Sequence, residues 1–532
     1  MVKGFRQIAV LTTASRVLGM VRDMAYAYFW GRTGLADLWV IAFMIPNLAR
    51  RIFGEGALSS SFIPVYLEEC HADPKRAARL ADTVTSVLVA ILSGIVVVGE
   101  LGIWLYWALW ARRADTRLML VLTAIMLPYM VLVCAAAVLG GVLNAHRHFA
   151  APAIAPILLN VAIIGTLALT ARAMGWSPEN QVLGVAVAVV AAGVLQLAVQ
   201  WLPLRSYGVR LRPAWDIRSE SFRRIFLLMV PMVLGLTATQ INTLANNAMA
   251  WIFSNSAAKG EFFTLWGRAI RYPLGQGAVS GLYYSQRLYQ FPLGVLGISL
   301  ATAIYPVLSS DAAKGDMKAL TRTVAQGLQS SVFVAIPATA GFFLIGKALV
   351  CMLFEHGKFT RGDTPVVALT LAFYASGLCG YFVQQILARA FYSMQDTRTP
   401  LRSALTAVAA NILLNLTLIW VLGIAGLAAA TALCAYLQAA MLAVALHRRL
   451  GSSLWQGVAP TFLRTLAATA AMGLVGLAVL ALMKGLPDDR RSDAVRVMAV
   501  VPAAGVTYLV AARLLRIEAL SLILGSRKRQ AG

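Results

Sequence analysis

Charged residues are scarce in this chain of 532 residues. Asp, Glu, Lys and Arg make up 13% of it, about half of the roughly 25% that is typical of a soluble globular protein. Hydrophobic residues make up 59%, and the mean hydropathy is +0.74. The apolar residues form long continuous runs without the apolar–polar alternation that a membrane β-barrel requires. This composition excludes a soluble protein and a β-barrel, and it predicts an all-α polytopic membrane protein.

The chain also lacks the sequence motifs of disulfide, metal and catalytic sites. Its five cysteines are scattered and are interpreted as small apolar core residues. There is no GxxxxGK[ST] phosphate loop, no HExxH, no GxSxG and no acidic metal cluster, so we expect a transporter that is not an enzyme and has no metal or cofactor. We expect no cleavable signal peptide, because the first apolar stretch is long and contains Arg16, Arg22 and Asp23.

The charge that is present is strongly positive, with a net charge of +24. No soluble basic domain exists to bind nucleic acid, so we attribute the excess to membrane topology and to contact with anionic lipid headgroups. More basic residues fall at the two termini and in the loops on their side than in the opposite loops. The positive-inside rule therefore predicts that both termini lie in the cytoplasm.

About fourteen apolar segments are long enough to cross roughly 30 Å of hydrocarbon. They are predicted at residues 8–30, 35–66, 80–108, 118–144, 153–174, 182–204, 224–253, 279–308, 321–346, 365–393, 401–421, 425–447, 458–484 and 494–516. Because the number is even, the two termini lie on the same side of the membrane.

The two halves of the chain resemble each other. Residues 139–160 and 387–415 both contain a helix end, a short polar turn, a proline and an apolar helix with the sequence Leu-Leu-Asn, and residues 61–65 resemble residues 303–307. The offset is six segments, which predicts two parallel six-helix lobes around a central cavity, the layout of an alternating-access transporter. The predicted domains are an N-terminal lobe, a C-terminal lobe and two additional helices, at residues 1–220, 221–452 and 453–532.

Five arginines lie inside the predicted spans, at Arg16, Arg22, Arg50, Arg51 and Arg287. A charged side chain at the centre of a bilayer costs about 2.5–3.5 kcal/mol. We therefore expect these arginines to face a water-filled cavity, which a cationic lining would make suitable for an anionic substrate. Snorkelling of the side chains to the headgroups is the alternative.

Two carboxylates lie close to these arginines in the sequence. Asp23 could pair with Arg22, and Glu55 lies four residues after Arg51, the spacing of a helical ion pair. Arg50 and Arg51 are adjacent and point about 100° apart on a helix, so we expect only one of them to line the cavity.

Proline and glycine interrupt two of the predicted spans. Pro46, Gly54, Gly56 and Pro64 lie in the span at 35–66, and Pro292, Gly294 and Gly297 lie in the span at 279–308. Such interruptions suit helices that bend as a cavity opens and closes, with a static kink as the alternative.

Several stretches, in order, resemble the MurJ (MviN) family. They are SRVLGMVRD (15–23), PNLARRIFGEGALSSSFIPV (46–65), YYSQRLYQFPLGVLG (283–297), HGKFT (356–360) and FYSMQDTRTP (391–400). The resemblance runs from about residue 8 to residue 450. Members of the family are lipid II flippases of the multidrug/oligosaccharidyl-lipid/polysaccharide exporter superfamily. The resemblance therefore implies a protein of the bacterial inner membrane that moves an undecaprenyl-diphosphate-linked peptidoglycan precursor across it.

The resemblance also implies roles for individual residues. The family's cavity arginines fall on Arg16, Arg22, Arg50 and Arg287, and further polar positions of the same motifs fall on Asp37 and Glu55. By analogy, the last two helices form a groove for the polyprenyl tail. We carry over no sodium site, because residues 224–253 contain no Asp or Glu.

The loop at residues 254–280 is longer than the family pattern and contains Phe262, Phe263, Trp266 and Tyr272. We expect an interfacial hairpin on the periplasmic side, with a lineage-specific loop without a role as the alternative.

Three other functions remain open at this point. A flippase for another lipid-linked oligosaccharide would share the need for diphosphate binding. A drug or cation antiporter would need acidic residues in the cavity, and a membrane scaffold would not need the arginines. Lipid II and membrane lipids are the expected partners, and the sequence is silent on protein partners.

Overall fold

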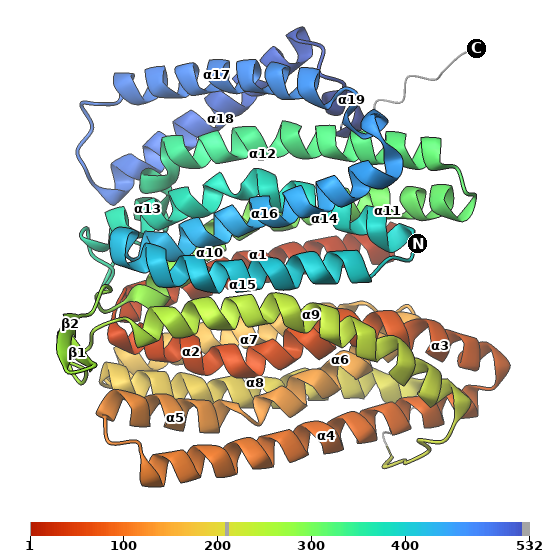
Figure 1. Ribbon diagram of the computed structural model, residues 1–532. Helices are drawn as coiled ribbons and strands as arrows, with labels where there is room; N and C mark the ends of the chain where they lie inside the picture. The colour runs from red at the N-terminus through yellow and green to blue at the C-terminus, as the bar shows by residue number, and fades with distance from the viewer. Residues whose placement is uncertain (1, 208–211, 524–532) are drawn as a thin grey trace. The chain divides into compact units, whose positions relative to one another are not determined.

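The computed structural model describes residues 2–207 and 212–523 (Figure 1). Within them, the side chains of residues 2–9, 54–60, 231, 234–236, 238–239 and 522–523 are not described. The described chain forms nineteen α-helices, four short π or 3-10 segments and one two-stranded sheet. It divides into two compact units, Met1–Trp251 with Asn255–Val279 and Ile252–Ser254 with Ser280–Gly532.

The first unit is a bundle of long helices with one β-hairpin. Its elements are α1 (Val2–Trp30), α2 (Gly34–Ala49), η1 (Arg50–Ala57), α3 (Leu58–Ala72), α4 (Pro74–Leu109), α5 (Ala114–Met126), α6 (Tyr129–Ala145), α7 (Ala150–Ala168), η2 (Leu169–Ala173), α8 (Pro178–Ser206), α9 (Glu220–Ile252), β1 (Phe262–Leu265) and β2 (Arg268–Arg271). Helix α7 packs against both α1 and α8, and α6 packs against α8 and α4. Helix α1 thus packs mainly against α7.

The second unit is also helical. Its elements are α10 (Ala278–Pro292), η3 (Leu293–Gly297), α11 (Ile298–Ala313), α12 (Met317–Phe354), α13 (Asp363–Ser376), α14 (Leu378–Ser393), α15 (Arg398–Leu422), α16 (Ile424–Leu450), η4 (Ser452–Trp455), α17 (Val458–Leu482), α18 (Arg490–Leu514) and α19 (Glu518–Ile523). Helix α12 packs against α13, α14, α17 and α18, and α15 pairs with α16.

Eleven helical stretches of the described residues are long and apolar enough to cross a membrane. The prediction of an all-α polytopic membrane protein is therefore confirmed, whereas the count of fourteen spans is not. The helical stretches at residues 2–30, 34–72 and 220–252 are not among the eleven. Two of these stretches contain the predicted cavity residues of the first half of the chain, and the charge of those residues lowers the hydropathy of the helices that carry them.

Helix α9 belongs almost entirely to the first unit. Near its start, Arg224 forms an ion pair of 2.5 Å with Glu68 at the end of α3, and Ser221 donates a hydrogen bond to Glu69. The boundary between the compact units thus lies at the end of α9, whereas the predicted lobes meet at residues 220 and 221. The division into parts at 1–220, 221–452 and 453–532 stays a prediction.

Two of the predicted interruptions are π-helical. Segment η1 begins at Arg50, within the predicted span at 35–66, and η3 lies within the predicted span at 279–308. In a π-helix each N–H bonds to the carbonyl five residues earlier, and short π segments inside α-helices occur frequently at functional sites. The interruption of both spans is confirmed, and bending at these segments stays a prediction.

The turns that end α6 and α14 have the same backbone geometry. Arg147 and Gln395 both have positive φ, at 59° and 60°, and each precedes a proline, Pro152 or Pro400, by five residues. In each turn the N–H of this residue bonds to the carbonyl three residues earlier, at 3.0 Å, and the next N–H bonds to the carbonyl five residues before it, at 2.8 or 2.9 Å. This is the Schellman pattern of helix ends, and it supports the internal repeat.

Candidate functional site

Arg22 lies on α1 and is held by two side chains of the first unit. Its Nε and Nη2 donate hydrogen bonds to Oδ1 of Asp23 at 3.1 and 2.8 Å, and its Nη1 donates one to Oδ1 of Asn160 on α7 at 3.0 Å. The side chains of Arg22 and Asp23 are only 12% and 4% exposed. The ion pair offsets the charge of the guanidinium, and the contact with α7 sets its direction.

Asn160 is a functional candidate that the sequence prediction missed. Its Nδ2 donates a hydrogen bond to the backbone carbonyl of Ser15 on α1, at 3.3 Å, while its Oδ1 accepts the bond from Arg22. The residue is buried, so both ends of the amide are used inside the protein. The available signal was a polar amide at the end of Leu-Leu-Asn, within an otherwise apolar helix.

Arg50 approaches the same region of the first unit from another element. It is half-buried at the start of η1, where its Nε donates a hydrogen bond to Oδ1 of Asn47 at 2.8 Å. The buried Tyr129, at the start of α6, lies within electrostatic range of both Arg50 and Arg22. Arg22 of α1 and Arg50 of η1 therefore both lie in the neighbourhood of Tyr129.

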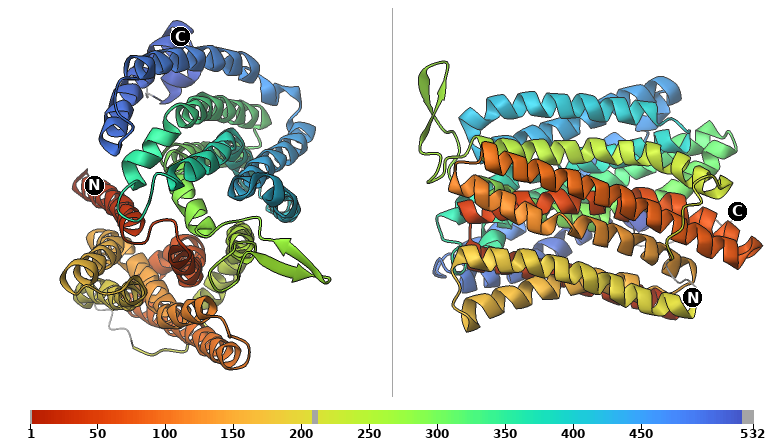
Figure 2. Two further views of the ribbon diagram at one scale, coloured as in Figure 1. Left: turned by 90° about the vertical axis from the view of Figure 1, so that its left-hand side faces the viewer. Right: turned by 90° about the horizontal axis from the view of Figure 1, so that it is seen from below.

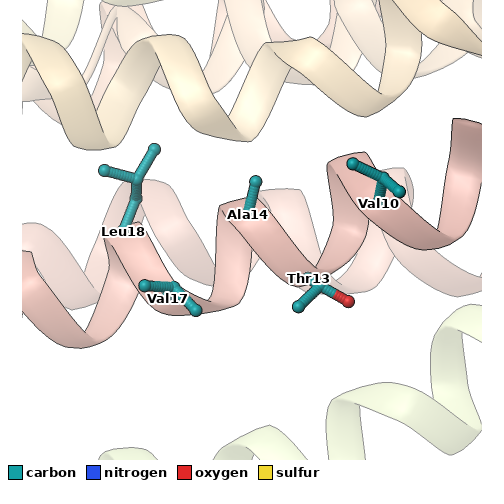
Figure 3. A pocket seen from close by; sticks show the side chains of 5 residues that line it. All are labelled: Val10, Thr13, Ala14, Val17 and Leu18. Atoms are coloured by element: carbon teal, nitrogen blue, oxygen red, sulfur yellow. The ribbon is translucent and has the colours of Figure 1, made fainter.

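Arg16 is exposed, unlike Arg22 on the same helix. Six residues correspond to about 600° of helical rotation, so the two side chains leave α1 about 120° apart. A third face of α1 borders a hollow of 580 Å³, lined by Val10, Thr13, Ala14, Val17 and Leu18 (Figure 3). Because this lining is apolar, the hollow suits hydrocarbon and not a phosphate group.

Arg51 has a neutral partner. It is half-buried in η1, and its Nη1 donates a hydrogen bond to Oε1 of Gln240 on α9 at 3.4 Å. The expected partner Glu55 lies outside the residues whose side chains the structure describes, so both its pairing with Arg51 and its predicted role in the site stay predictions.

Asp37 lies in the first turn of α2 and is buried. Its Oδ2 accepts a hydrogen bond from the backbone N–H of Gly277 at 2.9 Å, and the neighbouring Arg32 donates one to the carbonyl of Gln276 at 3.0 Å. These bonds hold the segment that follows the hairpin against the loop between α1 and α2. The structure thus assigns Asp37 a structural contact, and its predicted part in substrate binding stays a prediction.

Arg287 lies on α10 in the second unit and is half-buried. Its Nη2 donates a hydrogen bond to the hydroxyl of Tyr283 at 3.0 Å, and its guanidinium carbon lies 4.5 Å from the centre of that ring. The adjacent Gln286 donates a hydrogen bond to the hydroxyl of Tyr374 at 3.0 Å. This contact with the ring of Tyr283 is a cation–π interaction, which attracts the guanidinium without adding a negatively charged group.

The first unit thus holds three cationic groups in different surroundings. Arg22 is paired with a carboxylate, Arg50 donates to a neutral amide and Arg16 is exposed. A planar guanidinium binds phosphate and carboxylate oxygens in a bidentate manner and stays charged at all physiological pH values. The guanidinium groups of Arg22 and Arg50 are therefore of the kind that can bind a diphosphate or a similar anion.

A family model described as "Lipid II flippase MurJ" matches residues 26–487 of the chain. Arg50 and Arg287 lie within the matched residues, and Arg16 and Arg22 precede them. The "Probable lipid II flippase MurJ" of Vibrio cholerae serotype O1 is 33% identical over 454 residues, 83% of this chain and 82% of that protein. The "Lipid II flippase MurJ" of Burkholderia cenocepacia is 31% identical over 452 residues, 83% of each chain.

Solved structures show the same fold. A structure named "Lipid II flippase MurJ, inward closed conformation" matches with a TM-score of 0.73 and 20% identity, over 96% of this chain and 99% of that one. An inward-facing multidrug resistance MATE family transporter of the MOP superfamily matches with a TM-score of 0.63 and 12% identity, over 84% of this chain and 99% of that one. At these identities the likeness shows the fold alone.

Proposed function

The chain belongs to the MurJ family, and from this membership we propose that it is a lipid II flippase. It carries the undecaprenyl-diphosphate-linked peptidoglycan precursor from the cytoplasmic to the periplasmic leaflet of the bacterial inner membrane. Transport proceeds by alternating access, and both termini lie in the cytoplasm, as the distribution of basic residues indicates. The substrate and the membrane lipids are its partners.

The structural observation that supports this function best is that Arg22 and Arg50 both lie within electrostatic range of the buried Tyr129. Ionisable residues inside membrane-spanning segments are rare, and they mark the paths of substrates or ions. The diphosphate is the most highly charged part of lipid II, and hydrogen bonds to charged groups contribute about 1.5–3 kcal/mol each. We therefore assign Arg22 and Arg50 to the diphosphate, and Arg16 and Arg287 stay predicted substrate-binding residues.

The apolar end of the substrate needs a surface of its own. Helix α17 exposes Leu463, Leu474 and Leu482, and the adjacent α18 exposes Met498 and Val501. Exposed leucine and methionine side chains on paired helices can hold a polyprenyl chain by dispersion contacts alone. These helices are the proposed groove for the tail.

The experiment uses cells depleted of their own lipid II flippase that express this chain. Lipid II that reaches the outer leaflet is measured by its accessibility to a reagent that does not cross the membrane. We expect the unmodified chain to restore accessibility, and Arg22→Ala and Arg50→Ala to lose most of it. Arg50→Lys keeps the charge and loses the bidentate geometry, so its transport should lie between that of the unmodified chain and that of Arg50→Ala.

Arg218→Ala is the matched control, because Arg218 is an exposed arginine in the segment before α9. It should transport as well as the unmodified chain. Wild-type transport by both alanine variants at normal membrane levels would contradict the role of the arginines. If the inserted, unmodified chain restores no accessibility, the substrate is another lipid-linked sugar.

A further inference from the structure

The hairpin between α9 and α10 ends in an unusual turn. Strands β1 and β2 are antiparallel, with Leu265 opposite Arg268, so the turn consists of two residues. These residues, Trp266 and Gly267, both have positive φ, at 49° and 77°. Positive φ at both positions defines a type I′ turn, in which the first position favours Asn, Asp or Gly.

Tryptophan is poorly suited to this backbone conformation. A bulky side chain at positive φ is a steric outlier, because its Cβ approaches the neighbouring carbonyl. The indole does not recover this cost by packing within the protein, since Trp266 is 95% exposed. Strain of this kind points to a functional requirement for the side chain. A contact between the indole and something outside this chain would account for the strained turn.

The residues around Trp266 indicate what that contact is. Phe262 and Leu265 are 56% and 44% exposed, and Arg268 and Arg271 are exposed on the opposite strand. Residues 254–277 contain three basic residues and one acidic residue. Tryptophan concentrates at the membrane–water interface, and basic side chains there are attracted to anionic headgroups.

The placement of the hairpin agrees with this composition. In both views of Figure 2 it extends sideways from the helices and not along their direction, and the right-hand view places it at the level where the helices of the first unit end. A hairpin in this position suits contact with a membrane surface beside the bundle.

Contacts at the base of the hairpin hold this direction. Ser256 donates a hydrogen bond to Oδ2 of Asp115 at the start of α5, at 2.9 Å. The backbone N–H of Asn255 bonds to the carbonyl of Leu274 at 2.9 Å, and the rings of Phe263 and Tyr272 pack with their centres 5.0 Å apart. A hairpin braced in this way presents its tip in a constant orientation.

We propose that the hairpin is a membrane anchor. The tip formed by Trp266 and Leu265 inserts into the interfacial layer of the adjacent leaflet, and Arg268 and Arg271 bind anionic phospholipid headgroups. Strand addition by another protein fits less well, because each strand has only four residues and β2 carries two arginines. The anchor is independent of the transported substrate.

The test uses the full chain in nanodiscs of phosphatidylethanolamine and phosphatidylglycerol, with or without bromine on the acyl chains near the headgroups. The emission of Trp266 is isolated as the difference between the unmodified chain and Trp266→Asn, a substitution that suits the turn. Thr264→Ser is the matched control, since it alters the same hairpin and keeps the indole.

We expect the Trp266 component to lie at short wavelength, to lose most of its intensity with brominated lipid and to be protected from aqueous acrylamide. Arg268→Gln combined with Arg271→Gln should reduce the quenching by brominated lipid, and Thr264→Ser should leave it unchanged. The proposal is overturned if the component emits at long wavelength and is quenched by acrylamide alone. Protection that appears only in native membranes, with all their proteins, would show a protein partner and would also overturn it.

Discussion

The buried carboxylate of Asp37 accepts a hydrogen bond from the backbone N–H of Gly277, with 2.9 Å between Oδ2 and the nitrogen. Gly277 has φ of 79°, a conformation that side chains other than glycine's rarely adopt. A Cβ at this position would also lie 2.3 Å from the carbonyl oxygen of Arg32. The contact therefore depends on glycine for two separate reasons.

Gly277→Ala should destabilise the protein. The left-handed conformation alone costs a residue with a Cβ about 1–2 kcal/mol, and the clash with the backbone of Arg32 adds to this. We expect a lower midpoint of thermal unfolding in detergent. Gly275→Ala is the control, because a Cβ there meets open space. Equal midpoints for the two variants would refute the role of this contact.

Asn160→Leu should reduce lipid II transport although Asn160 need not touch the substrate. The substitution removes the acceptor for Nη1 of Arg22 and the donor to Ser15, so the guanidinium loses the partner that directs it. The measurement is outer-leaflet accessibility of lipid II as a function of its amount in the membrane. A purely structural role would lower the level of inserted protein instead.

Asn160→Asp separates orientation from charge. It keeps an acceptor for Arg22 and adds a second carboxylate beside Asp23, which makes the region less attractive to a diphosphate. We expect normal insertion with weaker transport. Transport equal to that of the unmodified chain would show that the local charge does not matter.

The stability of the protein should rise with pH in the alkaline range because of Lys259. Burial lowers the pKa of this lysine to about 8. The charge of Arg113 also lowers this pKa, whereas the carboxylates of Asp115 and Asp37 raise it. Its Nζ donates to the carbonyl of Trp251 and lies 4.3 Å from the centre of that ring.

Between pH 8 and 10.5 the folded protein has released the proton of Lys259 and the unfolded chain retains it. The unfolded state then binds more protons, so the free energy of unfolding increases with pH. Lys259→Met should remove this contribution, seen as a shallower rise of the unfolding midpoint, and substitution of the exposed Lys358 by Met should not. If the unfolding midpoint of Lys259→Met rose with pH as steeply as that of the unmodified chain, the effect would be ruled out.

Element positions could be predicted from the sequence because membrane helices are long apolar runs. The predicted spans at 458–484 and 494–516 correspond closely to α17 and α18. A hairpin was also expected within residues 254–280, and the structure contains one there. Each of these predictions rests on residues that are neighbours in the chain.

The contacts of the site could not be predicted in the same way. Periodicity shows which face of a helix a residue occupies, but not which distant residue meets it. Arg22 meets Asn160 across 138 positions, and Asp37 meets Gly277 across 240. The π segment at Arg50 also changes the angular spacing on which the sequence argument about Arg50 and Arg51 depends.

The matching turns after α6 and α14 bear on the ancestry of the chain. Arg147 and Gln395 share a backbone conformation and a hydrogen-bond pattern but have unrelated side chains. This is the outcome expected when a gene segment duplicates and its copies diverge, because main-chain hydrogen bonds must be preserved while surface side chains are free to change. A search for duplicated halves in relatives of this chain will therefore succeed better with backbone torsion angles than with residue identity.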